Sequence, residues 1–331
     1  MRAVAVTPTR AARRAGIALG LLWLVLPAAA AAQSAWVPLK GEGAISLVLQ
    51  NLEFGGHFDE HGEKLDGAVP SRAYIGIFHF EYALTDRVAV TARLPYVASK
   101  FTGHDDEPAT AFLREQYEEF QRTHPEATGS SLDTGELYST FQDFNLTLRY
   151  NALDRGGVAV TPVIGVTIPS HHYRTIGEAA PGQDRRALHV GVNIGRLLDP
   201  VLPNAYVHGR YTYAFVEDLL GINLDRSAAE LEVGYAITPI INARALVNWA
   251  RTHGGIPFSR SLEDAFLFLA HDRLLAVRYW HAGVGATVSL TDSIDLDGAW
   301  VTFLAGSDTH YGMGVSVGLT WRVLSAAIPE P

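Results

Sequence analysis

Polar or ionisable side chains recur at every second position in several segments of this sequence, with apolar residues between them. In residues 144–150, Asn145, Thr147 and Arg149 alternate with four apolar side chains. Successive side chains of a β-strand point to opposite faces, so this pattern predicts strands with one apolar and one polar face. If the apolar faces meet lipid, the polar faces enclose an interior. The side chains predicted to line that interior are His79, Glu81, Arg93, Asp143, Arg149, His208, Arg210, Glu230, Glu232, Arg244, His281 and Asp297.

Charges of both signs in an enclosed interior admit two interpretations. They can form a polar path for a solute. Alternatively, they can pair into salt bridges that fill the interior, since a barrel of modest size can be packed by its own side chains. The turn around Thr238-Pro239 brings Glu230 and Glu232 close to Arg244, which predicts an internal ladder of ion pairs.

Residue patterns for other chemistry are weak. The two histidines of the Ser-His-His run at 170–172 cannot share one metal from a strand, because adjacent side chains diverge. The Asp-Asp-Glu run at 105–107 lacks the spaced ligands of a calcium loop. The chain has no cysteine, which excludes thiol nucleophiles and thiolate metal sites, and it has no Gly-x-Ser-x-Gly elbow. We therefore expect no catalytic residue, no metal site and no cofactor.

The elements that position the polar side chains are twelve alternating segments. A strand of about ten residues, rising ~3.3 Å per residue and tilted by ~40°, covers the ~25 Å apolar band of an outer-membrane barrel. Strands of soluble proteins are about half as long. The fold class is therefore all-β, a 12-stranded antiparallel transmembrane β-barrel. The predicted strands are 43–54, 72–83, 88–98, 139–151, 157–168, 187–197, 204–215, 228–236, 240–250, 278–289, 294–304 and 311–322.

Short and long connections alternate between these strands. The short ones are 84–87, 152–156, 198–203, 237–239 and 290–293, and the long ones are 55–71, 99–138, 169–186, 216–227, 251–277 and 305–310. Several short ones carry turn residues such as Thr85-Asp86. This alternation is typical of an outer-membrane barrel with short periplasmic turns and long extracellular loops.

Aromatic side chains near both ends of the strands predict two belts at the level of the lipid headgroups. The belt near the short turns comprises Tyr82, Tyr150, Tyr206, Tyr235 and Trp321, and the belt near the long loops comprises Tyr74, Tyr96, Tyr213, Trp249, Trp280 and Tyr311.

The first 32 residues have the three parts of a secretory signal. Three arginines between residues 10 and 14 precede the apolar run 17–26, and small residues then offer a cleavage site near Ala32. The alternative is a retained anchor. Removal of residues 1–32 leaves residues 33–331 as one barrel domain with 22 basic and 35 acidic residues, a formal charge of −13. That charge argues against nucleic acid as a partner.

Two of the long connections contain helical patterns. Residues 111–123 have aromatic side chains near helical spacing, and the segment Ser261 to Asp264 resembles a capping box that opens a helix over Ala265–Ala270. The aromatic side chains of these connections are predicted to form an apolar gate over the mouth of the barrel, or else a cap that merely covers its rim. These side chains are Phe112, Tyr117, Phe120, Phe258, Phe266 and Phe268.

Several hairpins resemble a known family. Residues 80–88 (Phe-Glu-Tyr-Ala-Leu-Thr-Asp-Arg-Val), the Leu-Pro-Tyr at 94–96 and residues 143–150 (Asp-Phe-Asn-Leu-Thr-Leu-Arg-Tyr) are similar to the proteobacterial barrel family named for the meta-pathway of phenol degradation. The resemblance spans most of residues 72–250. Members are regarded as outer-membrane transporters of small, often aromatic, compounds, so the resemblance implies such a channel and supplies no catalytic motif.

We therefore expect a channel in the outer membrane of a Gram-negative cell, for passive uptake of small hydrophobic or aromatic molecules. Its further partners would be outer-membrane lipid and the outer-membrane assembly machinery. We do not expect an enzyme. Three alternatives stay open: an outer-membrane lipid hydrolase, a closed structural or adhesion barrel without transport, and a nonselective porin.

The two faces of the last strand should respond differently to charge. An arginine at Val315 or Val317, on the predicted lipid face near mid-membrane, should cost ~2–4 kcal/mol of folding free energy, and an arginine at Ser316 should cost much less. Denaturant titration of the three variants in lipid vesicles measures these costs. Equal losses at positions 316 and 317 would refute the assigned faces.

Overall fold

The alternating segments form one antiparallel sheet in the computed structural model of the chain, which describes residues 35–103, 108–123 and 132–323. The sheet closes into a 12-strand barrel, which confirms the predicted fold class. The predicted signal segment 1–32 and the acidic run 105–107 lie outside the described residues. The strands are β1 (Gly43–Phe58), β2 (Lys64–Thr85), β3 (Val88–Phe101), β4 (Tyr138–Phe141), β5 (Phe144–Tyr150), β6 (Leu153–Arg155), β7 (Val158–Ile168), β8 (Ala187–Leu197), β9 (Ala205–Val216), β10 (Arg226–Thr238), β11 (Ile241–Thr252), β12 (Arg278–Thr291), β13 (Ile294–Ser307) and β14 (Thr309–Val323).

The first and last strands close the barrel. β1 pairs with β14 from Gly43 opposite Val323 to Phe58 opposite Thr309, and β1 also pairs with β2. An open sheet would leave a row of unpaired backbone groups at each edge, and this pairing removes both edges. The predicted strand 139–151 is divided into β4 and β5, which both pair with β3, and the short β6 pairs with β7.

The two faces of the sheet alternate as the sequence pattern predicts. Large apolar side chains are exposed on the outer face, and their neighbours along each strand are buried on the inner face. Examples on the outer face are Leu47 and Leu49 of β1, Leu146 and Leu148 of β5, and Val317 and Leu319 of β14; examples on the inner face are Ser46, Val48, Thr147, Arg149 and Ser316.

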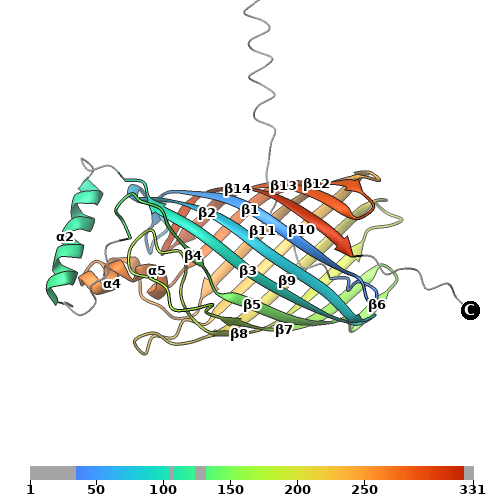
Figure 1. Cartoon of the computed structure of the whole chain (residues 1–331), viewed down its shortest axis with the longest axis horizontal. Helices are drawn as coiled ribbons and strands as arrows, with labels where there is room; N and C mark the ends of the chain where they lie inside the picture. The colour runs from blue at the N-terminus through green and yellow to red at the C-terminus, as the bar shows by residue number, and fades with distance from the viewer. Residues whose placement is uncertain (1–34, 104–107, 124–131, 324–331) are drawn as a thin grey trace, which may run out of the picture.

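The helices lie together at one end of the barrel (Figure 1). They are α2 (Pro108–Thr123), α3 (Phe258–Ser261), α4 (Ala265–Leu269) and α5 (His271–Leu274). We call this end, with the connections that carry the helices, the cap end, and the opposite end, where β6 lies, the turn end. No helix among the described residues is both long and apolar enough to cross a membrane.

The strands at the cap end are longer than predicted. β1 and β2 continue until only residues 59–63 separate them, and Asp308 alone separates β13 from β14. The predicted loops 55–71 and 305–310 are therefore mostly strand. The physical reason is that β1 beyond residue 54 still has partners on both sides, since it pairs with β2 and with β14 after a bulge at Gly55.

Two smaller predictions are wrong. Tyr206 does not join the belt at the turn end, because it shares the inner face with His208 and donates its hydroxyl to Glu232 Oε1 at 2.8 Å. The helix predicted over 265–270 is present as α4, but Ser261 does not cap it. Asp264 does so, since its carboxylate accepts hydrogen bonds from the backbone N–H groups of Phe266 and Leu267.

Candidate functional site

The N-terminal segment of the described chain enters the barrel at the turn end. Thr161 Oγ1 donates a hydrogen bond to the carbonyl of Ala35 at 2.6 Å, and Arg149 donates one to the carbonyl of Trp36 at 3.0 Å. The Trp36 ring lies so close to β8 that a Cβ added at Gly195 would be 2.5 Å from it. Glycine at 195 therefore makes room for the indole, and the segment narrows the interior at this end.

The predicted interior charges are paired at the turn end. Arg149 is fully buried and forms an ion pair with Glu81. Arg244 lies 3.7 Å from Glu232 and 3.3 Å from Asp297, so Glu232 forms the ion pair predicted with Arg244, whereas Glu230 lies opposite Arg210. These contacts satisfy buried charges whose desolvation would otherwise be costly.

A cavity of about 430 Å³ remains between these groups. We call it the turn-end cavity. It is lined by Trp36, Tyr206, His208, Glu232, Arg244 and Asp297, among others. Its lining contains the Trp36 indole and side chains of paired charges. The turn end of the interior is therefore polar, and it is only partly filled.

A second cavity, of about 310 Å³, lies inside the barrel at the cap end. We call it the cap-end cavity. Its apolar lining residues include Leu52, Phe54, Ile75, Val97, Tyr279 and Phe303. Its polar lining residues include Gln142, Glu178, Arg226, Asp272 and His310. An apolar cavity of roughly 150 Å³ already holds benzene in another protein, so this space is large enough for a small aromatic molecule.

The remaining residues predicted for the interior lie along its length. His79 and Arg93 are opposite each other on β2 and β3, and Arg93 is exposed although it lies on the inner face. Glu230 is opposite Arg210 on β10 and β9. Asp143, at the break between β4 and β5, accepts a hydrogen bond from the Tyr173 hydroxyl at 2.7 Å. The His281 ring lies between Tyr279 and Phe303, with ring centroids 4.3 and 3.9 Å away.

The aromatic side chains predicted to form the gate pack mainly on one another in the cap. Phe120 stacks on Phe266 with ring centroids 6.1 Å apart, and Phe112 meets the buried Phe268 edge-on at 5.1 Å. Tyr117 packs against the same cluster, whose buried members are Phe101, Leu113, Phe120, Leu132, Ala179, Ala265, Phe268 and Leu269. Phe258 belongs to a second cluster and stacks on His57 at 4.2 Å. The cap therefore has its own small apolar core.

Two acidic side chains lie between the loops of the cap, and Asp133 connects these loops. Asp133 accepts hydrogen bonds from the backbone N–H groups of Glu178 and Ala179 and from the Tyr117 hydroxyl, at 2.8–3.0 Å. Burial raises the pKa of Asp133, and these hydrogen bonds oppose the shift. Burial raises the pKa of Glu178 well above its usual range, and Asp272 and Asp133 add to the effect. The protonated form of Glu178 is therefore favoured beside the cap-end cavity.

Sequence reasoning missed the N-terminal segment and the cap-end cavity. Nothing in the local pattern around Ala35 and Trp36 indicates insertion into a barrel, because their partners lie on β5, β7 and β8. The apolar residues that line the cap-end cavity could have been predicted from the sequence. Leu52, Phe54 and Ile75 lie on the inner face by strand alternation, where a purely polar interior would have polar residues.

Serine and histidine side chains meet on the outer face near the cap end. Ser227 Oγ lies 2.7 Å from His253 Nε2 and 3.0 Å from the Tyr211 hydroxyl, and Ser227 is only 2% exposed. The nearby carboxylate of Asp225 is bonded to Tyr213 and to the backbone of Val216. The serine is therefore covered and the acid is used elsewhere, which is not the arrangement of a hydrolytic triad. In the 170–172 run, His171 contacts Ser170 and Thr140, whereas His172 contacts Asp184.

Comparison with known proteins supports the fold. No family model and no curated protein matches this chain. The COG4313 outer membrane channel from Pseudomonas putida F1 is similar in structure, with a TM-score of 0.65 and 14% identity over 89% of this chain and 100% of that one. More distant are the NanC porin (TM-score 0.46, 8% identity, 84% and 100% covered) and the P. putida toluene transporter TodX (0.42, 10%, 88% and 92%). The fold is that of an outer-membrane β-barrel; membership of the phenol meta-pathway family stays a prediction.

Replacement of Trp36 by alanine should widen the interior at the turn end. The indole lines the turn-end cavity and packs against Gly195, so its removal joins new space to that cavity. We expect a severalfold rise in single-channel conductance in planar bilayers. Leu39→Ala, at a 61% exposed position of the same segment, is the matched control and should change nothing. Equal conductance in all three proteins would show that Trp36 does not restrict the interior.

Proposed function

We propose that the chain is an outer-membrane channel for passive uptake of small apolar or aromatic solutes. The observation that carries the proposal is the cap-end cavity, which lies inside the barrel and has Leu52, Phe54, Ile75, Val97, Tyr279 and Phe303 among its lining residues. A solute pocket of this kind combines an apolar surface with a few polar groups that orient the ligand. The exposed apolar outer face would contact lipid, and the cap end would be extracellular.

Passage would proceed from the cap-end cavity towards the turn-end cavity. Arg93 lies on the inner face at mid-height and is exposed, which favours a wet space there over a fully packed plug. Paired charges and Trp36 then line the interior at the turn end. An apolar solute would be held first by the apolar lining residues of the cap-end cavity and would leave through polar surroundings, where it binds weakly. Weak binding at the exit favours release.

The cap would act as the gate. Its aromatic side chains, including Phe120, Phe266 and Phe268, pack on one another, so entry requires these contacts to separate. The strongest rival function is a closed structural barrel without transport, because the same packing can also be permanent. The covered Ser227 gives the lipid hydrolase less support.

Filling the cap-end cavity should block uptake. Ala73 is one of its lining residues, whereas Tyr74 is exposed on the other face of β2. Ala73→Trp should slow the entry of a radiolabelled monoaromatic compound into intact cells by roughly tenfold, equivalent to ~1.4 kcal/mol. Tyr74→Trp is the matched control and should leave entry unchanged at equal amounts of folded protein. Unaltered entry in Ala73→Trp would remove the cavity from the transport route.

Removal of most of α2 should open the gate. Replacement of Phe112–Thr123 by a short Gly/Ser link removes the contacts of Phe112 with Phe268 and of Phe120 with Phe266, but it leaves the strand pairing intact. We expect a folded barrel with higher conductance and lower preference for apolar solutes. A folded deletion variant with the conductance and solute preference of the parent would refute the gate, and a parent that passes no solute would favour the closed barrel.

A further inference from the structure

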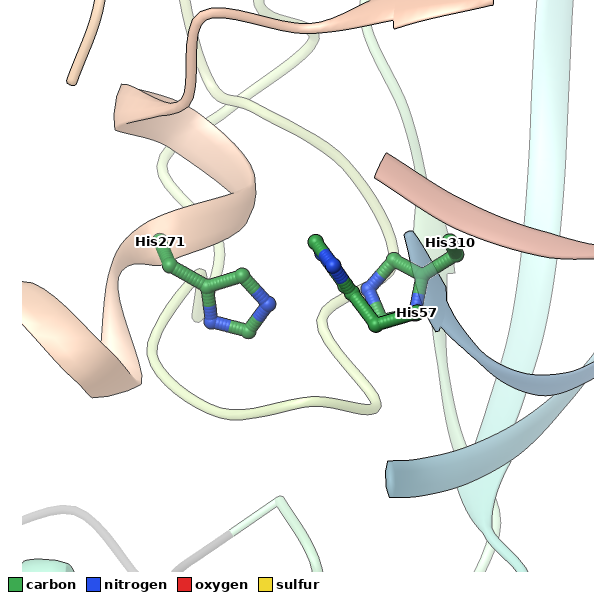
Figure 2. Close-up of side chains that lie close together, drawn as sticks. All are labelled: His57, His271 and His310. Atoms are coloured by element: carbon green, nitrogen blue, oxygen red, sulfur yellow. The ribbon is translucent and has the colours of Figure 1, made fainter. Parts of the chain in front are cut away.

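Three histidines from distant parts of the chain meet at the cap end. His57 is near the end of β1, His310 is near the start of β14, and His271 opens α5. His57 and His310 are opposite each other in the closing pair of strands. One ring nitrogen from each of the three histidines lies within 4.8 Å of the others. Figure 2 shows the His271 ring turned with a nitrogen towards the other two rings.

The hydrogen bonds of His57 and His271 leave one nitrogen lone pair available on each of these two rings. His57 Nδ1 and His271 Nδ1 each lie 2.6 Å from a backbone carbonyl oxygen, of Phe58 and of Phe268. Each therefore donates its Nδ1–H, and Nε2 of both rings has no hydrogen-bond partner among the described residues. His310 Nε2 is 2.8 Å from Asp272 Oδ1. Histidines that bind metal ions are usually fixed by such contacts to carbonyl oxygens and carboxylates.

Two acidic groups border the same cluster, and one of them, Glu178, is buried. Both carboxyl oxygens of Glu178 are buried without a hydrogen-bond partner, and Oε2 lies 3.5 Å from His271 Nε2. Asp272 Oδ1 lies 3.4 Å from that nitrogen. An unsatisfied buried polar group calls for a specific explanation, and a metal ion bound beside it is one. A divalent cation would place a positive charge beside the buried carboxyl group of Glu178.

We propose that His57, His271 and His310 bind a divalent transition-metal ion of the zinc class. Imidazole nitrogens suit zinc, copper, nickel and iron, and three histidines leave one coordination position for a carboxylate or water. Zn–N bonds of ~2.0–2.1 Å in a tetrahedron place the nitrogens ~3.3 Å apart, so the rings would draw together by small side-chain rotations.

The bound ion would fasten the cap to the barrel. It would join α5 to β1 and β14 at the rim, and His310, Asp272 and Glu178 also line the cap-end cavity. Metal binding would therefore hold the cap closed over that cavity. The metal site does not depend on the proposed function, but the effect of the metal on uptake does.

The test uses the full chain, purified without a polyhistidine tag, refolded in detergent and treated with EDTA before dialysis. Calorimetric titration with Zn²⁺ should show one ion per chain, and Co²⁺ should give the visible absorption of a tetrahedral site. His57→Gln, His271→Gln and His310→Gln should each weaken binding by more than ~100-fold, because each removes a ligand. His172→Gln, at a side chain that is 97% exposed, is the matched control and should bind like the parent.

Folding and closure are measured in the same samples. Heat-modifiable migration in gels reports whether each variant is a folded barrel, and limited proteolysis reports the accessibility of the cap. Zn²⁺ should slow cleavage of the cap in the parent but not in folded His271→Gln. A folded parent that binds no Zn²⁺ or Co²⁺, or binding that survives all three substitutions, overturns the site. Binding without slower cleavage overturns the fastening of the cap.

Discussion

The pairing of β1 with β14 is the contact on which the rest of the molecule depends. A lipid bilayer has no water in its core to form hydrogen bonds with the backbone groups at the edge of a sheet. A sheet in a bilayer must therefore satisfy these groups by closing into a barrel. Once these two strands pair, the inner faces of all the strands enclose a common space. The same ladder continues beyond residue 54 and fixes His57 opposite His310. Enclosure and the histidine cluster are therefore consequences of one register.

The enclosed space differs along the barrel. At the turn end, buried charges are close to opposite charges, as Arg149 is to Glu81 and Arg244 to Asp297. Such pairs offset the cost of desolvation, and they leave a polar lining. At the cap end, apolar side chains such as Val97 and Phe303 line the space together with the acidic Glu178 and Asp272. A molecule inside would thus meet different surroundings at each end, which is the basis of the transport proposal.

Much of the barrel could be predicted from residue alternation, because strand faces are a local property. Thr147 and Leu148 lie on the inner and outer faces as their polarity predicts, and the ion pair of Glu232 with Arg244 followed from one hairpin. The errors arose where residues distant in sequence determine the position of a side chain or the length of a strand. Tyr206 lies on the inner face, and the polarity of an aromatic residue does not predict which face it occupies. Trp36 is positioned by β8, and the extension of β1 is stabilised by strands at both ends of the sequence. His271 reaches the rim only through the packing of the cap.

The pairing of β1 with β14 also affects the order in which the parts of the barrel form. Gly43 and Val323 are partners, yet almost the whole barrel sequence separates them, and contacts between distant residues form late because the intervening chain must first be brought together. Most other paired strands are close neighbours in sequence and can form as hairpins. His57 and His310 belong to the late pair, so the histidine cluster is complete only after the final strand has joined the first. A signal from that cluster would therefore report the finished barrel and not its partly folded precursors.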